Sequence, residues 1–181
     1  MIIVEGPDNS GKSTLISQLM ADLNLTLAKS LESGPPKTAM DLYNRSVYLI
    51  EQAITRKNRN IIADRSSIIC ESIYGPLCRG KDLWVDMIEK KIDVVSSLNA
   101  LNPFYIYCRP PIIRMQEFAN HNIKSYDTEE HLSAIEKKSS YIIKAYDNYF
   151  ATMNPYLYYV YDYTQKDSYK NLVYRLKEYL K

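Results

Sequence analysis

A phosphate-binding loop motif near the N-terminus constrains this chain more than any other feature. Residues 6–14 read Gly-Pro-Asp-Asn-Ser-Gly-Lys-Ser-Thr and satisfy the pattern G-x-x-x-x-G-K-[ST]. Residues 1–5 before it are mainly apolar and β-branched, as in a buried parallel strand, and residues 15–20 after it are apolar at helical spacing. A strand, a glycine loop and a helix in this order predict a binding site for a nucleoside triphosphate.

The residue types within the loop have distinct expected roles. Gly6 and Gly11 let the backbone bend around a polyphosphate, whose oxygens accept hydrogen bonds from amides at the helix N-terminus. Lys12 offers positive charge to the β- and γ-phosphates, and the Ser13 hydroxyl is a ligand for Mg²⁺. We therefore expect ATP and Mg²⁺ as cofactors. The predicted ATP-binding residues are Gly6, Asn9, Ser10, Gly11, Lys12, Ser13 and Thr14.

Composition is typical of one intracellular domain that spans residues 1–181. With 181 residues, 46% of them hydrophobic, the chain can bury a single sizeable core, and a net charge of +2 does not by itself indicate a nucleic-acid or membrane surface. Three cysteines without metal-ligand spacing predict reduced thiols and a cytoplasmic location, the host cytoplasm if the protein is viral. No apolar run approaches the roughly 18 residues of a membrane helix. Because the first predicted strand begins at Met1, we expect no signal or transit peptide.

Short apolar runs alternate with longer helical patterns along the chain. The predicted strands are residues 1–5, 26–31, 60–64, 104–108 and 156–161, and the main predicted helices after the first are residues 38–57, 67–74, 83–98, 128–152 and 168–180. Such alternation predicts an α/β fold in which a five-stranded parallel sheet is covered by helices on both faces. A polar stretch within residues 119–128 is the expected lid.

Charged residues follow several of the predicted strands. Ligands of parallel sheets bind beyond the carboxyl ends of strands, and Asp8, Asp64, Arg65 and Arg109 all fall at such ends. The Arg65 guanidinium is a bidentate fork suited to the phosphate of an acceptor. The Asp64 carboxylate is a candidate ligand of Mg²⁺ or of its bound water.

These motifs together resemble the thymidylate kinase family. The resemblance rests on residues 4–14, on the pair Asp64-Arg65, and on Tyr74 followed by Arg79-Gly80, and it is greatest to the compact members that DNA bacteriophages encode. The stretch between Arg65 and Tyr74 is one residue longer than in that family. The element order matches over nearly the whole chain. The resemblance implies a P-loop three-layer sandwich, a small-molecule nucleotide acceptor and a homodimer packed through the helices around Val47 and Val94.

The resemblance also implies individual roles in acceptor binding. Asp8 would contact the 3′-hydroxyl of a deoxynucleotide, Arg79 its base or phosphate, and Glu71 the sugar or the Arg65 side chain. Tyr43 and Arg45 fall within a residue or two of the positions that stack on and bond to thymine in the family. The predicted substrate-binding residues are Asp8, Tyr43, Arg45, Arg65, Glu71 and Arg79.

The sequence departs from the family at the lid. Thymidylate kinases usually place an arginine in the phosphate loop or the lid to neutralise the migrating phosphoryl group, whereas this loop has Asn9 and Ser10. The candidates for the missing cation are Arg109, Arg114 and Lys124. We favour Arg114, in the helix that enters the lid, with Lys124 as an accessory. The predicted catalytic residues are Asp8, Lys12, Arg65 and Arg114.

The leading interpretation is a deoxynucleoside-monophosphate kinase that phosphorylates dTMP or a related pyrimidine nucleotide. A deoxynucleoside kinase is an alternative, but it would require a base at the end of the second strand, near Glu32, where no arginine is adjacent. A second alternative is a kinase for a hydroxymethylated pyrimidine base in phage DNA, the only case with a nucleic-acid partner. The absence of a lid arginine leaves a third, a non-catalytic nucleotide-binding protein.

Overall fold

The structure is a computed structural model that describes residues 1–32, 34–56, 60–119 and 129–181, and it describes no side chains within residues 116–136. The predicted lid, including Lys124, therefore lies outside the described residues apart from Ala119. None of the helices within the described ranges is long and apolar enough to cross a membrane.

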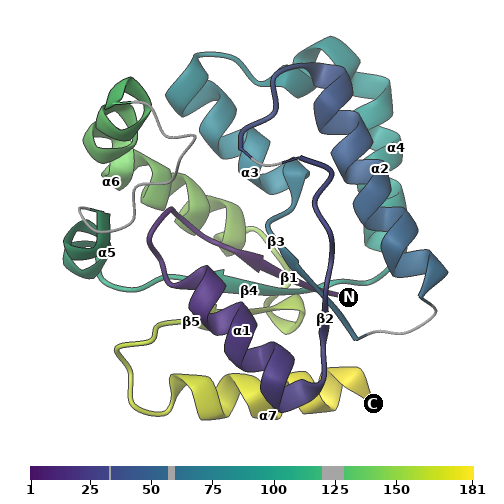
Figure 1. Ribbon diagram of the computed structural model, residues 1–181, viewed down its shortest axis with the longest axis vertical. Helices are drawn as coiled ribbons and strands as arrows, with labels where there is room; N and C mark the ends of the chain where they lie inside the picture. The colour runs from purple at the N-terminus through teal and green to yellow at the C-terminus, as the bar shows by residue number, and fades with distance from the viewer. Residues whose placement is uncertain (33, 57–59, 120–128) are drawn as a thin grey trace.

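A five-stranded, fully parallel sheet forms the centre of the molecule (Figure 1). The strands are β1 (Ile2–Glu5), β2 (Thr26–Leu27), β3 (Ile61–Asp64), β4 (Phe104–Cys108) and β5 (Tyr158–Tyr161). Their order is β2-β3-β1-β4-β5, so the strand that leads into the phosphate loop is central and buried throughout. Parallel neighbours on both sides explain why β1 is so apolar.

Helices cover both faces of this sheet. They are α1 (Lys12–Leu23), α2 (Ala39–Thr55), α3 (Ser67–Tyr74), α4 (Ile88–Ala100), α5 (Ile112–Ala119), α6 (Glu129–Ala151) and α7 (Ser168–Leu180), joined by the short turns η1 (Gly75–Arg79), η2 (Leu83–Met87) and η3 (Pro155–Leu157). One core lies between the sheet and the pair α1 and α7, and the other between the sheet and α2, α3, α4 and α6 (Figure 1). The predicted α/β three-layer sandwich is confirmed.

The second strand is much shorter than expected. Residues 26–31 were predicted to be a strand, but only Thr26 and Leu27 pair with β3. Both lie at the edge of the sheet with exposed side chains. Beyond them, the backbone of Lys29 bonds to the Gln52 side chain of α2, donating to Oε1 at 2.8 Å and accepting from Nε2 at 2.9 Å. The side-chain amide of Gln52 thus replaces the sheet partner and ends the strand.

Two helix starts follow the capping chemistry of the sequence. The Thr38 hydroxyl accepts a hydrogen bond from the Asp41 backbone N–H at 3.1 Å, so α2 begins directly after Thr38. The Ser66 hydroxyl accepts hydrogen bonds from the backbone N–H groups of Ile68 and Ile69 at the start of α3. The second cap fixes the corner after β3, where Asp64 and Arg65 lie.

Candidate active site

The phosphate loop follows β1 at the carboxyl edge of the sheet, and both of its glycines have a backbone conformation that other residues rarely adopt. Gly6 has φ +143° and Gly11 has φ +84°. A Cβ on Gly6 would lie 2.5 Å from the Cys108 carbonyl oxygen of β4, and one on Gly11 would lie 3.2 Å from the Tyr163 ring. The loop therefore packs against its neighbours through backbone that carries no side chain, which lets a ligand approach the amides closely.

Lys12 is buried beneath the loop. Its ammonium donates hydrogen bonds to the Pro7 carbonyl oxygen and, at 3.4 Å, to the Ser10 hydroxyl. Burial and the nearby charge of Arg65 together lower the pKa of Lys12 to about 8, although the charges of Asp8 and Asp64 oppose the shift. The Lys12 ammonium is thus held by groups of the predicted ATP-binding loop itself.

Asp8 and Arg65 meet beside this loop. The Arg65 Nη2 lies 2.6 Å from the Asp8 Oδ1 and 3.3 Å from the Gly6 carbonyl oxygen. Tyr74 supports both, because its ring lies 5.1 Å from the guanidinium carbon and its hydroxyl accepts a 3.0 Å hydrogen bond from the Asp8 backbone N–H. Burial raises the pKa of Asp8, but the charges of Arg65 and Lys12 outweigh burial and hold it well below its usual range. Asp8 is therefore an ionised carboxylate.

Arg65 retains a capacity for further hydrogen bonding. Its Nε is buried and has no hydrogen-bond partner among the described residues. A buried donor of this kind is unfavourable until a ligand satisfies it. Its backbone is also unusual, since φ is 71° in the left-handed region, a conformation that costs a non-glycine residue roughly 1–3 kcal/mol. Both features fit a residue held in place for a ligand.

Glu71, within α3, and Arg79, at the end of η1, form a second ion pair. Glu71 is 2% exposed, and its Oε1 accepts a hydrogen bond from the Leu83 backbone N–H at 2.9 Å. Glu71 was predicted to contact the sugar or to orient Arg65. The structure shows its carboxylate paired with Arg79 instead.

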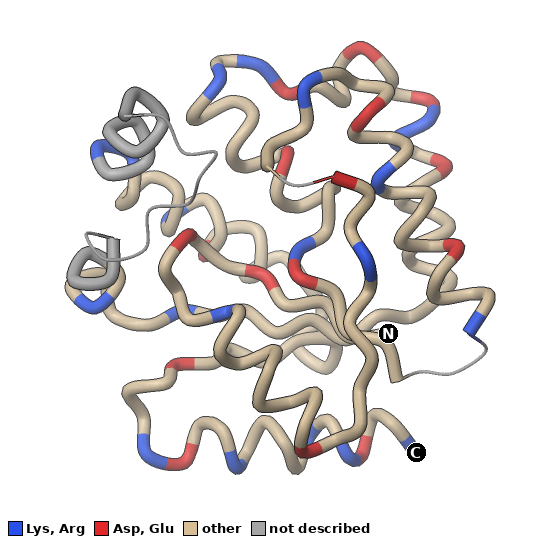
Figure 2. Tube along the Cα trace, in the orientation of Figure 1, with Lys and Arg blue, Asp and Glu red and all other residues tan. Residues whose placement is uncertain are grey.

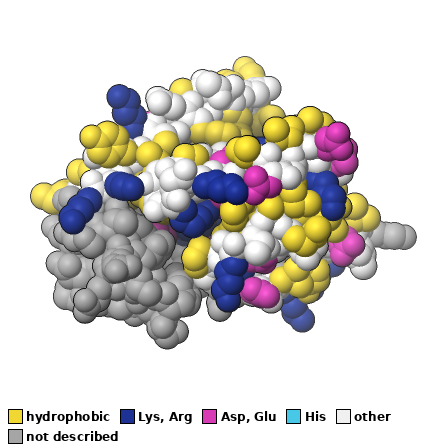
Figure 3. Space-filling model, turned by 90° about the horizontal axis from the view of Figure 1, so that it is seen from above, with side chains coloured by type: hydrophobic (Ala, Val, Ile, Leu, Met, Phe, Trp, Pro, Cys, Tyr) yellow, Lys and Arg dark blue, Asp and Glu magenta, His cyan; other side chains and the backbone are white. Residues whose placement is uncertain are grey.

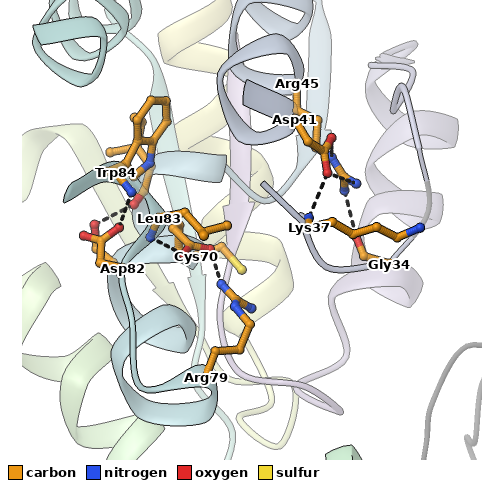
Figure 4. A network of polar contacts seen from close by, with 12 residues as sticks. Gly34, Lys37, Asp41, Arg45, Cys70, Arg79, Asp82, Leu83 and Trp84 are labelled. Carbon is orange, nitrogen blue, oxygen red and sulfur yellow. Dashed lines mark hydrogen bonds and ion pairs between the residues drawn. The ribbon is translucent and has the colours of Figure 1, made fainter. Parts of the chain in front are cut away.

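Tyr43 and Arg45 are engaged within the protein. Arg45 bonds to Asp41 at 2.7 Å and to the Gly34 carbonyl oxygen at 2.7 Å, so it anchors the loop before α2 (Figure 4). The Tyr43 ring lies 4.6 Å from the Lys90 ammonium of α4. The structure does not bring these two side chains together with Asp8 and Arg65, and their contact with a base stays a prediction.

The candidate Mg²⁺ ligands come from the first turn of α1 and the end of β3. Ser13 is the second residue of α1, and Asp64 ends β3 beside Val4 of β1. Both side chains are exposed, and the Asp64 charge acts on the pKa of Lys12. A hydroxyl and a carboxylate are the hard oxygen donors that Mg²⁺ prefers, so these residues fit the ion.

Of the candidate lid cations, Arg109 has an internal partner. Its Nε and Nη2 bond to the two carboxylate oxygens of Asp147 in α6, at 2.9 and 3.2 Å, and the Tyr107 hydroxyl donates to the same carboxylate. Arg114 is exposed on α5. Charged residues of both signs gather where β1, β3 and the loop meet (Figure 2), and Lys and Arg side chains lie near the middle of the face in Figure 3.

Comparison with known proteins identifies the fold. No protein-family model and no curated protein matches the sequence. The YorR protein of Bacillus subtilis, solved in complex with phosphorylated GDP, matches at 17% identity and a TM-score of 0.63 over 97% of this chain and 95% of that one. Deoxyadenosine kinase from M. mycoides with bound dCTP matches at 18% identity and a TM-score of 0.60 over 98% and 100%. The same kinase with bound dATP matches at 16% identity and a TM-score of 0.58 over 97% and 98%. The fold is that of the P-loop kinases.

Within this P-loop kinase fold, two residues near the loop escaped the sequence analysis. Tyr163, in the loop after β5, packs against Gly11. Glu5 ends β1 with a fully buried carboxylate that binds the Ser66 backbone N–H. A lone Glu at the end of an apolar strand was the available signal for Glu5. No sequence pattern marked the ring of Tyr163.

Proposed function

We propose that this protein is an ATP-dependent kinase of thymidylate kinase type that phosphorylates dTMP or a related pyrimidine deoxynucleoside monophosphate. The observation that carries the proposal is the Asp8–Arg65 pair beside the phosphate loop. An arginine whose Nε awaits a partner suits the phosphate of an acceptor that must lie next to the γ-phosphate of ATP.

The ionisation of Asp8 favours a nucleotide acceptor over a nucleoside acceptor. A nucleoside 5′-hydroxyl must lose a proton, and the most efficient base has a pKa near the working pH. The pKa of Asp8 lies well below its usual range, so this carboxylate is a weak base. It is well suited to accept a hydrogen bond from a sugar hydroxyl. An acceptor phosphate already carries the attacking oxygen and needs no such base.

The side chains of this site would promote transfer of the γ-phosphoryl group by positioning the acceptor and by offsetting negative charge. An oxygen of the acceptor phosphate bonds to the γ-phosphorus as the bond to the bridging oxygen of ADP breaks, and charge spreads over the equatorial oxygens. Lys12 and the loop amides offset that charge, while Arg65 holds the acceptor in line. Mg²⁺ held by Ser13 and Asp64 would neutralise charge on the β- and γ-phosphates. Arg79, paired with Glu71, is the proposed contact to the base or phosphate.

A deoxynucleoside kinase is the second candidate, and the matched deoxyadenosine kinase structures favour it. In this chain β2 ends at Leu27, and the nearest acidic residue after it, Glu32, is exposed and lies 3.4 Å from Arg45. A base supplied from the end of β2 would have to be this residue. The position of Glu32 on the surface makes the nucleotide acceptor the better fit.

A single assay separates these functions. Labelled ATP and Mg²⁺ are incubated with the protein and dTMP, dUMP, thymidine, deoxyadenosine or hydroxymethylated duplex DNA in parallel. We expect label in dTDP or dUDP and none in the nucleosides or the DNA. Label in a nucleoside monophosphate would establish the second candidate, and label in DNA would establish the base kinase. ATP binding without transfer to any acceptor would indicate a non-catalytic protein.

Homodimerisation is a separate proposal, on the outer surface of α2 and α4. These helices lie side by side (Figure 1), with Val94 buried and Val47 packed against the core. Exposed apolar side chains on them include Ile54, Ile88 and Ile92. Light scattering should give twice the chain mass for the protein and the single chain mass for Ile92→Glu. A monomeric wild-type protein would contradict the proposal.

A further inference from the structure

Glu5 is a fully buried carboxylate to which the proposed reaction assigns no role. It is the last residue of β1, directly before the phosphate loop, and its side chain is 0% exposed. Removing a carboxylate from water is unfavourable unless specific partners bind it. Burial raises its pKa to about 7, although the Ser66 backbone and the charges of Arg65 and Lys12 oppose the rise. Its contacts therefore need an explanation beyond packing.

Those contacts join three elements. The Glu5 Oε1 accepts a hydrogen bond from the Ser66 backbone N–H at 2.5 Å, and Oε2 accepts one from the Tyr146 hydroxyl of α6 at 3.4 Å. Ser66 is the N-cap of α3, and its hydroxyl accepts hydrogen bonds from the first backbone N–H groups of that helix. The carboxylate of β1 thus fixes the start of α3.

The residue immediately before Ser66 is Arg65, with its left-handed backbone. A conformation of this kind persists only where surrounding contacts hold it. Two hydrogen bonds flank it, from the Arg65 N–H to the Val4 carbonyl oxygen at 2.9 Å and from the Ser66 N–H to Glu5. The first is formed by backbone and belongs to any sequence with this fold. The second depends on one side chain.

We infer that Glu5 is a positioning residue whose Oε1, by holding the Ser66 N–H, keeps Arg65 in the backbone conformation that aims its guanidinium at the acceptor. The inference rests on the proposed function for the identity of that acceptor. The geometric part, from Glu5 through Ser66 to Arg65 and Asp8, consists of contacts within the described residues. Glu5 acts through a hydrogen-bond acceptor in a fixed place, so an uncharged group of the same shape should serve equally well.

Three substitutions of Glu5 separate the hydrogen bond from charge and volume. Glu5→Gln keeps an acceptor oxygen, Glu5→Asp withdraws the carboxylate by one methylene, and Glu5→Met fills the space without an acceptor. We expect Glu5→Asp and Glu5→Met to raise the KM for dTMP about tenfold with less than about a twofold change for ATP, and Glu5→Gln to stay within about threefold of wild type. Tyr146→Phe, which removes only the 3.4 Å contact, is the matched control and should match wild type.

A combined variant tests the route through Arg65. In an Arg65→Ala background, Glu5→Asp should add less than about a further twofold to the KM for dTMP, because residues that act as a unit are not additive. A full additional loss would overturn the inference. Equal impairment of Glu5→Gln and Glu5→Asp would also overturn it, since an acceptor oxygen kept in the same place would then not be enough to preserve the function of Arg65. An equal rise in the KM values for ATP and dTMP in Glu5→Asp would likewise overturn the inference.

Hydrogen exchange of the Ser66 amide, followed by NMR, tests the geometry without any assay of transfer. The amide should be protected in wild type and Glu5→Gln, and should exchange at least about tenfold faster in Glu5→Asp and in Glu5→Met. Should wild type phosphorylate no acceptor, the proposed function fails, yet this pattern still shows whether Glu5 holds the corner. Equal protection in all folded variants overturns the inference.

Discussion

Arg65 and Asp8 lie 57 positions apart in the chain, yet their side chains meet at 2.6 Å beside the phosphate loop. The sheet order explains the meeting, because β3 pairs directly with β1 and Val4 lies opposite Asp64. The residues that follow two neighbouring parallel strands emerge at the same edge of the sheet. The backbone of Arg65, directly after β3, is left-handed with φ 71°, and its guanidinium lies against the loop at Gly6 and Asp8.

The first prediction concerns this arginine. Arg65→Ala should raise the KM for the monophosphate at least about tenfold and lower kcat, with little change in the KM for ATP, because a misplaced acceptor loses its in-line geometry. Steady-state kinetics with each substrate varied in turn measures the effect. The control is Arg175→Ala, which removes an exposed arginine on α7, across the sheet from Arg65. Equal effects on both KM values would contradict the acceptor assignment.

Lys12 gives the second prediction. Lys12→Ala should lower kcat at least about a hundredfold, equivalent to about 3 kcal/mol of lost transition-state stabilisation. Within the part of the chain that the structure describes, its ammonium donates hydrogen bonds to Pro7 and Ser10 of the loop itself, so the cores should remain folded. Circular dichroism and a kinase assay on the same preparation measure both quantities. Lys170→Ala, an exposed lysine of α7, is the control. Near-normal turnover of Lys12→Ala would remove the lysine from the mechanism.

Two glycines with positive φ give a matched comparison for the third prediction. Gly6→Ala would bring a methyl group within 2.5 Å of the Cys108 carbonyl oxygen, which is backbone and cannot move away easily. We expect a loss of about 2–4 kcal/mol in the free energy of unfolding and weaker ATP binding. Gly80→Ala meets only strain from φ +71° and open space, so about 1 kcal/mol is expected without any effect on ATP. Urea unfolding and calorimetric titration with ATP measure these changes. Similar losses for the two variants would contradict the packing argument.

The sequence was sufficient for the fold wherever local patterns and the global topology agree. Buried β-branched strands, the glycine loop and the caps at Thr38 and Ser66 all depend on residues close together in the chain. The edge strand β2 was wrong in length because its end depends on Gln52, a side chain from another element. Apolar pattern alone does not reveal such a competing partner.

The sequence was enough to predict which residues belong to the site, but not which charged side chains form ion pairs with one another. Strand ends identified Asp8 and Arg65 as neighbours, because parallel topology brings them to one edge. Glu71 pairs with Arg79 rather than Arg65, and the choice depends on the π-helical turn Gly75–Arg79, which has no clear pattern in the sequence. Asp147 as the partner of Arg109 was equally invisible, since their pairing requires the placement of α6 against β4.

The fourth prediction is a pH dependence of stability from Glu5. Burial raises its pKa from 4.5 to about 7 in the folded protein, so between these values the folded state binds more protons than the unfolded state. Stability from this group is full below pH 4.5 and falls as pH rises through 7, by up to about 3 kcal/mol. Glu5→Gln should therefore gain stability relative to wild type from pH 5 to pH 8, as measured by urea unfolding. A difference that does not change with pH would place the pKa of Glu5 near its ordinary value.

The last prediction distinguishes the two arginines near the lid. Arg109 donates two hydrogen bonds to Asp147, so Arg109→Ala leaves that carboxylate without its cationic partner and should lower thermal stability. Arg114 lies exposed on α5, the helix that leads to residues 120–128. If it supplies the lid cation, Arg114→Ala should lower kcat about tenfold or more without weakening ATP binding, because a contact made on closure acts on the transition state alone. Arg114→Lys should restore only part of kcat, since an ammonium cannot bridge two phosphate oxygens as a guanidinium does. Single-turnover kinetics together with equilibrium binding of ATP separates the two effects. Full turnover in Arg114→Ala would move the assignment to Arg109 or Lys124, and full turnover in all three alanine variants would show that transfer proceeds without a cation from this part of the chain.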